Sequence, residues 1–272
     1  MNTESVNQNS VDIDKKSTLE MVEIINREDQ TVALAVKTAL PSIAAAIDAI
    51  VSRLRQGGRL FYVGAGTSGR LAIQDAAECT VTYGVPKGTV SAIMAGGNNA
   101  VFSPAENVED NFEAGVSAIA EANINERDCL VGISASGNAS YVCGALTEAA
   151  KRGAETVALL CNEHGKIADC ARYAICVPTG AEVISGSTRM KAGTAQKLVL
   201  NTISTVAMIQ LGKVTGNFMT WMTPTNEKLK KRAAFIVAQV CHVPEEKAAE
   251  LLENTHYNIQ EAITLYREDT YV

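Results

Sequence analysis

Short apolar runs alternate with helical segments through the middle of the chain. Apolar positions recur at helical spacing in residues 68–79 and 140–152. Short continuous apolar runs between such segments are typical of parallel strands that are buried on both faces. The runs are Arg59–Val63, Val90–Met94, Cys129–Ser134, Thr156–Cys161 and Tyr173–Val177. The pattern therefore predicts an α/β domain with a doubly wound parallel sheet, spanning roughly residues 40–220.

Helical patterns also precede this domain. Ser17 is followed three residues later by Glu20, which predicts a helix start with a capping box. A helical region from about Gln30 to Arg55 starts afresh at Pro41, because proline is tolerated in a first helical turn. We expect residues 1–16 to form a disordered or loosely packed tail, so that residues 1–39 comprise a tail and a helix.

The chain after the last apolar run contains only helical signals. A long helix is predicted from about Ser187 to Leu211, and Gly212 closes it. Three shorter helical segments follow at 226–241, 244–254 and 259–267. Such short helices need one another to bury their apolar faces. Residues 225–272 are therefore predicted to form a small three-helix bundle.

Composition and charge narrow the class of protein. With 272 residues, of which 47% are hydrophobic, the chain is long enough for one large core with a small appendage. The formal net charge is −6, and no run of Lys and Arg indicates a surface for nucleic acid. The densest basic cluster, at 228–232, is interpreted as a solvated helix face. We expect no nucleic-acid partner.

The N-terminal residues and the cysteines indicate a cytoplasmic protein. Residues 1–16 lack the apolar core of a signal peptide, and no run of about 18 apolar residues predicts a membrane span. The seven cysteines form no CxxC pair and are interpreted as reduced thiols, several of them inside apolar runs. The three histidines are widely separated, so we expect no metal site.

The first apolar run ends in a glycine-rich loop, Gly64-Ala-Gly66-Thr67-Ser68-Gly69. Ligands of open α/β sheets bind where the carboxyl ends of the strands lie. Glycine lets the backbone approach a ligand, and the free N–H groups at the following helix start attract an anion. The same GxGxxG spacing occurs in dinucleotide-binding proteins, which carry an acidic residue about 20 positions later. The second run instead ends at Met94-Ala-Gly-Gly97, with no carboxylate.

Two further loops have a similar character. Ser134-Ala-Ser136-Gly137 lies between the third run and a helix, where it predicts either a simple helix cap or a phosphate cradle. Two such loops in one sheet favour phosphate binding. The third loop leads into the long helix and offers Ser187, Thr188, Arg189 and Lys191 as ligand contacts. Its two cations are either solvated first-turn residues or ligand contacts, and their place at a helix N-terminus favours the second interpretation.

Four carboxylates lie close to these loops in the sequence. Glu78 lies near the end of the helix that the first loop opens, whereas Glu106, Glu109 and Asp110 follow the second apolar run. The latter three are either candidate acids and bases or ordinary first-turn acids that a helix dipole stabilises. The residue types alone do not decide between these roles.

Longer strings of residues make the interpretation more specific. Gly64–Arg70 with Asp75-Ala-Ala-Glu78-Cys79, and Gly186–Asn201, resemble the motifs of the N-acetylmuramic acid 6-phosphate etherases. Ile24–Asp29 and Thr225–Leu229 match as well, and the resemblance covers about residues 17–235. It implies a sugar isomerase (SIS) domain followed by a small C-terminal domain that is similar to a ubiquitin-associated (UBA) bundle.

The resemblance also implies a reaction. In this family a base removes the proton on C2 of the open-chain sugar, lactate leaves from C3, and water adds to the double bond. The family's acid is the glutamate of the Asp-Ala-Ala-Glu motif, which is Glu78 here. Its second catalytic glutamate is expected to be Glu106, in Glu106-Asn-Val-Glu-Asp110. The resemblance further implies no cofactor, a homodimer, and a place in N-acetylmuramic acid catabolism and peptidoglycan recycling.

Two segments depart from the family pattern. Residues 98–105 replace the helical, Glu-containing stretch that the family usually has there. Where the family usually reads Ser-Gly-Arg-Thr-Pro-Tyr-Val, this chain has Ser136-Gly-Asn138-Ala139-Ser140-Tyr-Val. A guanidinium and a hydroxyl group are absent, and Asn does not replace the bidentate fork of Arg. Two alternatives therefore remain beside etherase activity: a related isomerase or lyase that acts on another phosphosugar, and a sugar-phosphate sensor without catalysis.

Overall fold

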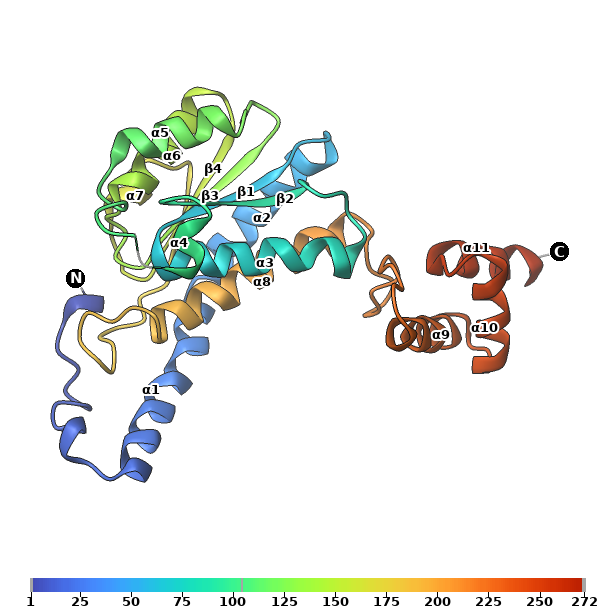
Figure 1. Ribbon diagram of the computed structural model, residues 1–272, viewed down its shortest axis with the longest axis horizontal. Helices are drawn as coiled ribbons and strands as arrows, with labels where there is room; N and C mark the ends of the chain where they lie inside the picture. Colours follow the sequence, from blue (N-terminus) through green and yellow to red (C-terminus); the bar gives the residue numbers. More distant parts are fainter. Residues whose placement is uncertain (1, 104, 271–272) are drawn as a thin grey trace. The chain divides into compact units, whose positions relative to one another are not determined.

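The computed structural model describes residues 2–103 and 105–270 (Figure 1). Its centre is a five-stranded parallel sheet of order β2-β1-β3-β4-β5. The strands are β1 Leu60–Gly64, β2 Val90–Met94, β3 Cys129–Ser134, β4 Glu155–Leu160 and β5 Tyr173–Cys176. Every residue of β1, β3 and β4 is buried, which is why these strands read as continuous apolar runs. The predicted doubly wound α/β fold is confirmed.

Helices cover both faces of this sheet. The chain reverses its direction along the sheet after β2. Because crossovers between parallel strands are right-handed, the β2–β3 and β3–β4 connections lie on the opposite face of the sheet from the β1–β2 connection. Figure 1 shows α5, α6 and α7 on one side of the sheet, and the beginning of α3 together with α8 on the other. The helices are α1 Thr18–Thr38, α2 Leu40–Arg55, α3 Gly66–Tyr83, α4 Asn99–Phe102, α5 Phe112–Glu121, α6 Ser140–Lys151, α7 Lys166–Asp169 and α8 Lys191–Gln210.

The first helix begins where the sequence predicts. Ser17 and Glu20 form the expected capping box, in which the backbone N–H of Ser17 donates to the Glu20 carboxylate at 2.8 Å. The helical pattern is interrupted at Ala39, and Pro41 lies in the first turn of α2. Among the described residues no single helix is long and apolar enough to cross a membrane, and only α1 and α2 taken together, across a 60° bend, pass that test.

Contacts divide the chain into two units. The first contains the residues up to Ala76 together with Gly88–Ala207, and the second contains Ala77–Lys87 and the residues from Met208 onwards. The second unit has its own core, in which Ile236, Leu252 and Ile263 are buried. Its three mutually packed helices are α9 Glu227–Cys241, α10 Glu245–Asn254 and α11 Ile259–Thr270. The predicted three C-terminal helices are therefore present.

The prediction of a loosely packed N-terminal tail is wrong for residues 3–10. Thr3, Asn7 and Ser10 are buried, and their polar groups bind residues that lie far away in the sequence. The short 3₁₀ helix η1, Asn2–Glu4, overlaps the start of this stretch, and a second one, η2 Ile13–Lys15, follows it. The sequence gives no hydrophobic signal of this packing, because hydrogen bonds hold residues 3–10 in place and not an apolar face.

Candidate active site

Two loops meet at the carboxyl ends of β1 and β3, where the strand order reverses. Gly64 at the end of β1 pairs with Ile133 near the end of β3, so the segments that follow lie side by side. A pocket of about 260 Å³ opens between them, at the place where doubly wound sheets bind ligands. Its lining consists of Glu4, Ala65, Gly66, Thr67, Ser68, Glu109, Ile133, Ser134, Ala135, Ser136, Ala139, Gly186 and Thr188.

The first loop presents backbone donors to this pocket. Gly66, Thr67 and Ser68 line it, and they form the first turn of α3, whose N–H groups have no acceptor within the helix. The Ser68 hydroxyl donates to Gln196 on α8 at 3.0 Å, which fixes the turn from behind. A Cβ on Gly69 would lie 2.2 Å from the Met94 sulfur, so only glycine permits this close approach.

The second loop is a compact turn stabilised by its own serines. Ser134 accepts a hydrogen bond from the N–H of Gly137 at 3.1 Å, and Ser136 accepts one from the N–H of Asn138 at 3.2 Å. Gly137 has a φ of +78°, and a Cβ there would lie 2.7 Å from Leu160. Of the predicted ligands, Ser134 and Ser136 line the pocket, whereas buried Gly137 shapes the loop.

Asn138 marks the departure from the family pattern, and its side chain is used within the loop. The amide nitrogen donates to the carbonyl of Ser136 at 3.3 Å, and the amide oxygen accepts from the N–H of Lys166 at 3.3 Å. The side chain therefore stabilises the turn.

The third loop contributes Thr188 and Gly186 to the pocket. Ser187 and Arg189 are not among its lining residues, and Arg189 is exposed. The N-terminus of α8 is already occupied, because the buried Glu182 carboxylate accepts the N–H groups of Lys191 and Ala192, each at 2.9 Å. A second anion has no free donors there.

Lys191 lies beneath the loop, in a buried ion pair. Its ammonium is 2.7 Å from the carboxylate of Glu28 on α1. Burial opposes the ionisation of Glu28, but hydrogen bonds from Lys191, Asn9 and Asn7 outweigh it and hold the pKa of Glu28 below its ordinary value. The Lys191 ammonium therefore binds a structural partner, the Glu28 carboxylate.

Of the four candidate carboxylates, Glu109 is the one that lines the pocket. Its backbone carbonyl accepts a hydrogen bond from the N–H of Tyr141 at 2.9 Å, which ties it to the start of α6 beside the second loop. Glu106 is exposed on the same connection and does not line the pocket. None of the three carboxylates of this connection is a first-turn acid, because Asn111 caps α5 and the first-turn acid is Glu113.

Glu78 is exposed on α3 and is not among the lining residues. Asp75, in the same motif, is buried and structural. It accepts hydrogen bonds from the Tyr62 hydroxyl at 2.9 Å, from Asn201 at 2.5 Å and from Ser204 at 2.9 Å. Asp75 thereby joins α3 to β1 and α8.

Sequence reasoning missed two contributors to this site. Arg70 donates from its guanidinium to the carbonyls of Val101 at 2.7 Å and Ala100 at 2.8 Å, and so fixes the connection that leads to Glu109. Glu4 reaches the pocket from the N-terminal segment, whose polar sequence carries no signal of this position. Among the described residues, no group of three or more His, Cys, Asp or Glu is arranged to hold a metal ion.

The fold and the family models define a SIS-domain protein. The model "SIS domain" matches residues 106–205, and "Glucokinase regulatory protein N-terminal SIS domain" matches residues 42–150. Phosphoheptose isomerases share the fold: the one from Francisella tularensis superposes with a TM-score of 0.58 at 19% identity, over 71% of this chain and 100% of that chain. The one from Neisseria gonorrhoeae gives 0.55 at 22% identity, over 70% and 98%.

Curated relatives narrow the class to one family. An N-acetylmuramic acid 6-phosphate etherase of Clostridium beijerinckii is 50% identical over 97% of this chain and 86% of the relative. That of Symbiobacterium thermophilum is 52% identical over 96% and 87%, and that of Vibrio vulnificus 48% over 97% and 88%. The chain belongs to the N-acetylmuramic acid 6-phosphate etherase family, which confirms the resemblance of its motifs.

Proposed function

We propose that this protein is a carbon–oxygen lyase that cleaves the D-lactyl ether of N-acetylmuramic acid 6-phosphate. The products are N-acetylglucosamine 6-phosphate and D-lactate. Membership of the family supports the reaction, and one observation carries its assignment to this pocket: the glycine–serine loops and the Glu109 carboxylate line the same cavity. An anion cradle and a base are what a phosphosugar elimination needs side by side.

The phosphate is bound by the loops of β1 and β3. The N–H groups at the start of α3 and the positive end of its dipole favour an anion there. Hydroxyl donors come from the pocket residues Thr67, Ser134, Ser136 and Thr188. Ser187, Arg189 and Lys191 remain outside this cradle in our proposal, because the first two do not line the pocket and Lys191 pairs with Glu28.

The chemical step is an elimination followed by hydration. The C1 aldehyde of the open-chain sugar acidifies C2, so a base removes that proton and the electron pair forms the C2–C3 double bond. The C3–O bond breaks, and the ether oxygen leaves with lactate, which takes up a proton from an acid. Water then adds its hydroxyl to C3 and a proton returns to C2. No redox step occurs, so no electron carrier is needed.

Glu109 is the base in this proposal. Glu109 lines the cavity, and its carboxylate has no hydrogen-bond or ion-pair partner within the described residues, so it is available to the substrate. Glu106, the base expected from the sequence, lies three residues earlier and outside the lining.

Glu78 remains the acid that the family motif implies. Because it is exposed and absent from the lining of its own chain's pocket, we infer that it acts across a homodimer, in the pocket of the partner subunit. We place the protein in the cytoplasm, where reducing conditions keep thiols reduced, since no disulfide bond joins cysteines within the described residues.

Lactate release from N-acetylmuramic acid 6-phosphate tests the assignment. We expect Glu109→Gln to lower kcat by about 10²-fold or more, as removal of a general base does, with an unchanged melting temperature. Glu113→Gln is the matched control, since it removes an exposed carboxylate from the neighbouring first turn of α5. Loss of activity in Glu106→Gln with retention in Glu109→Gln would return the role to Glu106. A wild type that binds phosphosugars but releases no lactate would contradict the etherase assignment itself.

A further inference from the structure

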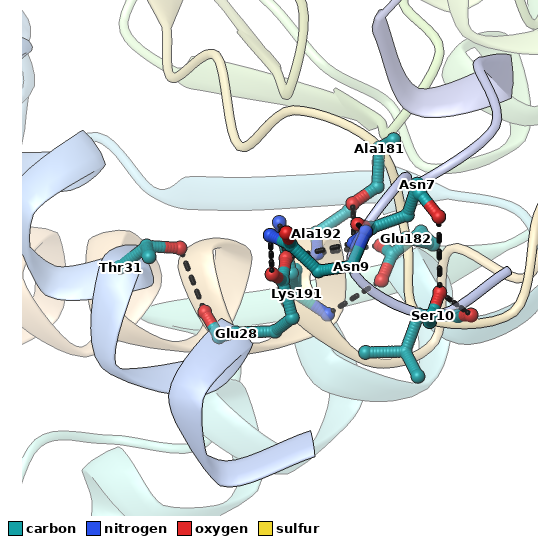
Figure 2. A network of polar contacts seen from close by, with 10 residues as sticks. Asn7, Asn9, Ser10, Glu28, Thr31, Ala181, Glu182, Lys191 and Ala192 are labelled. Carbon is teal, nitrogen blue, oxygen red and sulfur yellow. Dashed lines mark hydrogen bonds and ion pairs between the residues drawn. The ribbon is translucent and has the colours of Figure 1, made fainter. Parts of the chain in front are cut away.

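Residues 3–10, here named the N-terminal strap, are fastened to the third loop by a buried polar network (Figure 2). The Asn7 amide donates to the Glu28 carboxylate at 2.8 Å and to the carbonyl of Ala181 at 3.3 Å. Ser10 donates to the carbonyl of Val183 at 2.7 Å. The strap therefore runs along the segment that also carries Glu182, the cap of α8.

The Glu28–Lys191 pair lies at the centre of this network. The Glu28 carboxylate accepts hydrogen bonds from Asn9 and Asn7, each at 2.8 Å, and its third interaction is the 2.7 Å ion pair with Lys191 (Figure 2). Both charged side chains are nearly excluded from water, with exposed fractions of 5% for Lys191 and 7% for Glu28. A buried pair with satisfied hydrogen bonds has one geometry, so the strap has one position.

The first residues of the strap are fastened separately, to the second loop. The N–H of Thr3 donates to the Asn162 side chain at 3.2 Å, and the Asn162 amide donates back to the Thr3 hydroxyl at 3.1 Å. The same amide donates to the carbonyl of Ser136 at 3.0 Å. Asn162 therefore links the strap directly to a pocket residue.

Glu4 lies between these two attachments, and it lines the pocket. Its carboxylate lies against the third loop, since a Cβ on Gly186 would be 3.6 Å from Glu4 Oε2. Within residues 2–103 and 105–270, neither Glu4 nor Glu109 has a hydrogen-bond or ion-pair partner for its carboxylate. The strap thus delivers a second acceptor to a cavity whose remaining polar groups are mostly hydroxyl and N–H donors.

We propose that Glu4 is a specificity-determining residue, which accepts a hydrogen bond from a hydroxyl or amide N–H of the sugar and keeps the phosphate in the serine loops. The inference rests on the proposed phosphosugar site and deepens it. A carboxylate repels a phosphate and a lactyl carboxylate but attracts neutral donors. With Glu4 at one side and the α3 N-terminus at another, a phosphosugar has one favourable orientation in the pocket.

Calorimetric titration with N-acetylglucosamine 6-phosphate and with inorganic phosphate separates recognition of the sugar by Glu4 from recognition of the phosphate by the loops. Glu4→Ala is expected to weaken phosphosugar binding by about tenfold or more, because a charge-assisted hydrogen bond is lost. Its affinity for inorganic phosphate stays equal or rises. Glu4→Gln, which keeps one acceptor oxygen, recovers part of the loss. Asp14→Asn is the matched control, because it removes an exposed carboxylate from the following 3₁₀ helix.

The strap itself is tested by Asn7→Ala, which removes its link to Glu28. We expect Asn7→Ala to weaken phosphosugar binding, but by less than Glu4→Ala does. Combining the two substitutions should cause no additional loss of affinity, because both act through the same contact. Full additivity would contradict delivery of Glu4 by the strap.

Two outcomes would overturn the role of Glu4: unchanged affinity of Glu4→Ala for the phosphosugar, or an equal loss for both probes. The proposed etherase function is judged separately, by lactate release from the wild type. A wild type that binds the phosphosugar in a Glu4-dependent manner without releasing lactate would contradict that function and still support the inference.

Discussion

Removal of the Lys191 ammonium tests the buried network most severely. In the variant Lys191→Met the methylene stem keeps much of its volume, but Glu28 loses the partner at 2.7 Å while it remains buried. Breaking a buried pair from one side costs about 3–5 kcal/mol, because the remaining charge is left uncompensated. Asn7 and Asn9 still donate to Glu28, so we expect a loss near 3 kcal/mol at pH 7.

The assay is urea denaturation of wild type and variant at pH 7 and at acidic pH. The folded-state pKa of Glu28 is below its unfolded value in the wild type, so its stabilisation is present above about pH 4.3 and disappears as the pH falls through the folded pKa. In Lys191→Met the unpaired Glu28 has a raised folded pKa, so the penalty disappears as acid protonates it. The difference between the two proteins therefore shrinks on acidification.

The matched variant is Glu28→Gln, alone and combined with Lys191→Met. The double variant leaves no buried unpaired carboxylate, so it is expected to cost less than the sum of the two single variants by more than about 1 kcal/mol. A loss below about 1 kcal/mol for Lys191→Met at pH 7, or strict additivity in the double variant, would refute the idea that this ion pair fixes the strap and the third loop.

Three further predictions concern residues around the pocket. Asp75→Ala leaves the donors of Tyr62 and Ser204 without their acceptor and is expected to cost about 2–4 kcal/mol in urea denaturation; a loss below about 1 kcal/mol would contradict its structural role. Gly137→Ala meets Leu160 at 2.7 Å in a left-handed conformation, so we expect weaker binding of inorganic phosphate by calorimetry, and unchanged binding would contradict the loop geometry. Burial opposes the ionisation of Asp128, but hydrogen bonds led by Arg59 hold its pKa below the ordinary value. The ionised Asp128 therefore stabilises the folded protein above about pH 3.9, and this stabilisation disappears in acid. We expect Asp128→Asn to lower the free energy of unfolding in urea by less at pH 3 than at pH 7. An equal loss at both pH values would contradict this.

Local sequence patterns predict the elements that build the pocket. Buried strands leave continuous apolar runs, and a glycine- or serine-rich loop after such a run marks the carboxyl end of a strand. For this reason the amino-acid sequence alone places Gly66, Thr67, Ser68, Ser134 and Ser136 at one edge of the sheet. The four-residue helices α4 and α7 are not predicted, because one turn is too short to show a helical period.

Long-range contacts decide what local patterns leave open. Glu106 and Glu109 lie on one connection, and the hydrogen bond from the N–H of Tyr141 distinguishes them by fixing Glu109 beside the second loop. Lys191 has the local context of a ligand contact, because a cation is unfavourable at a helix start, but its partner Glu28 is 163 residues away. No local pattern reveals a pairing across that separation.

If the ether is cleaved by proton removal at C2 and C3–O bond breakage in the Glu109 pocket, isotopes from water must appear at defined positions of the products. The reaction is run in H₂¹⁸O and, separately, in D₂O, with mass spectrometry of lactate and of N-acetylglucosamine 6-phosphate. We expect ¹⁸O on C3 of the sugar and none at the ether-derived oxygen of lactate, deuterium at C2, and loss of both the C3 and the C2 label in Glu109→Gln. Label from water in the lactate hydroxyl, or a product without deuterium at C2, would contradict it.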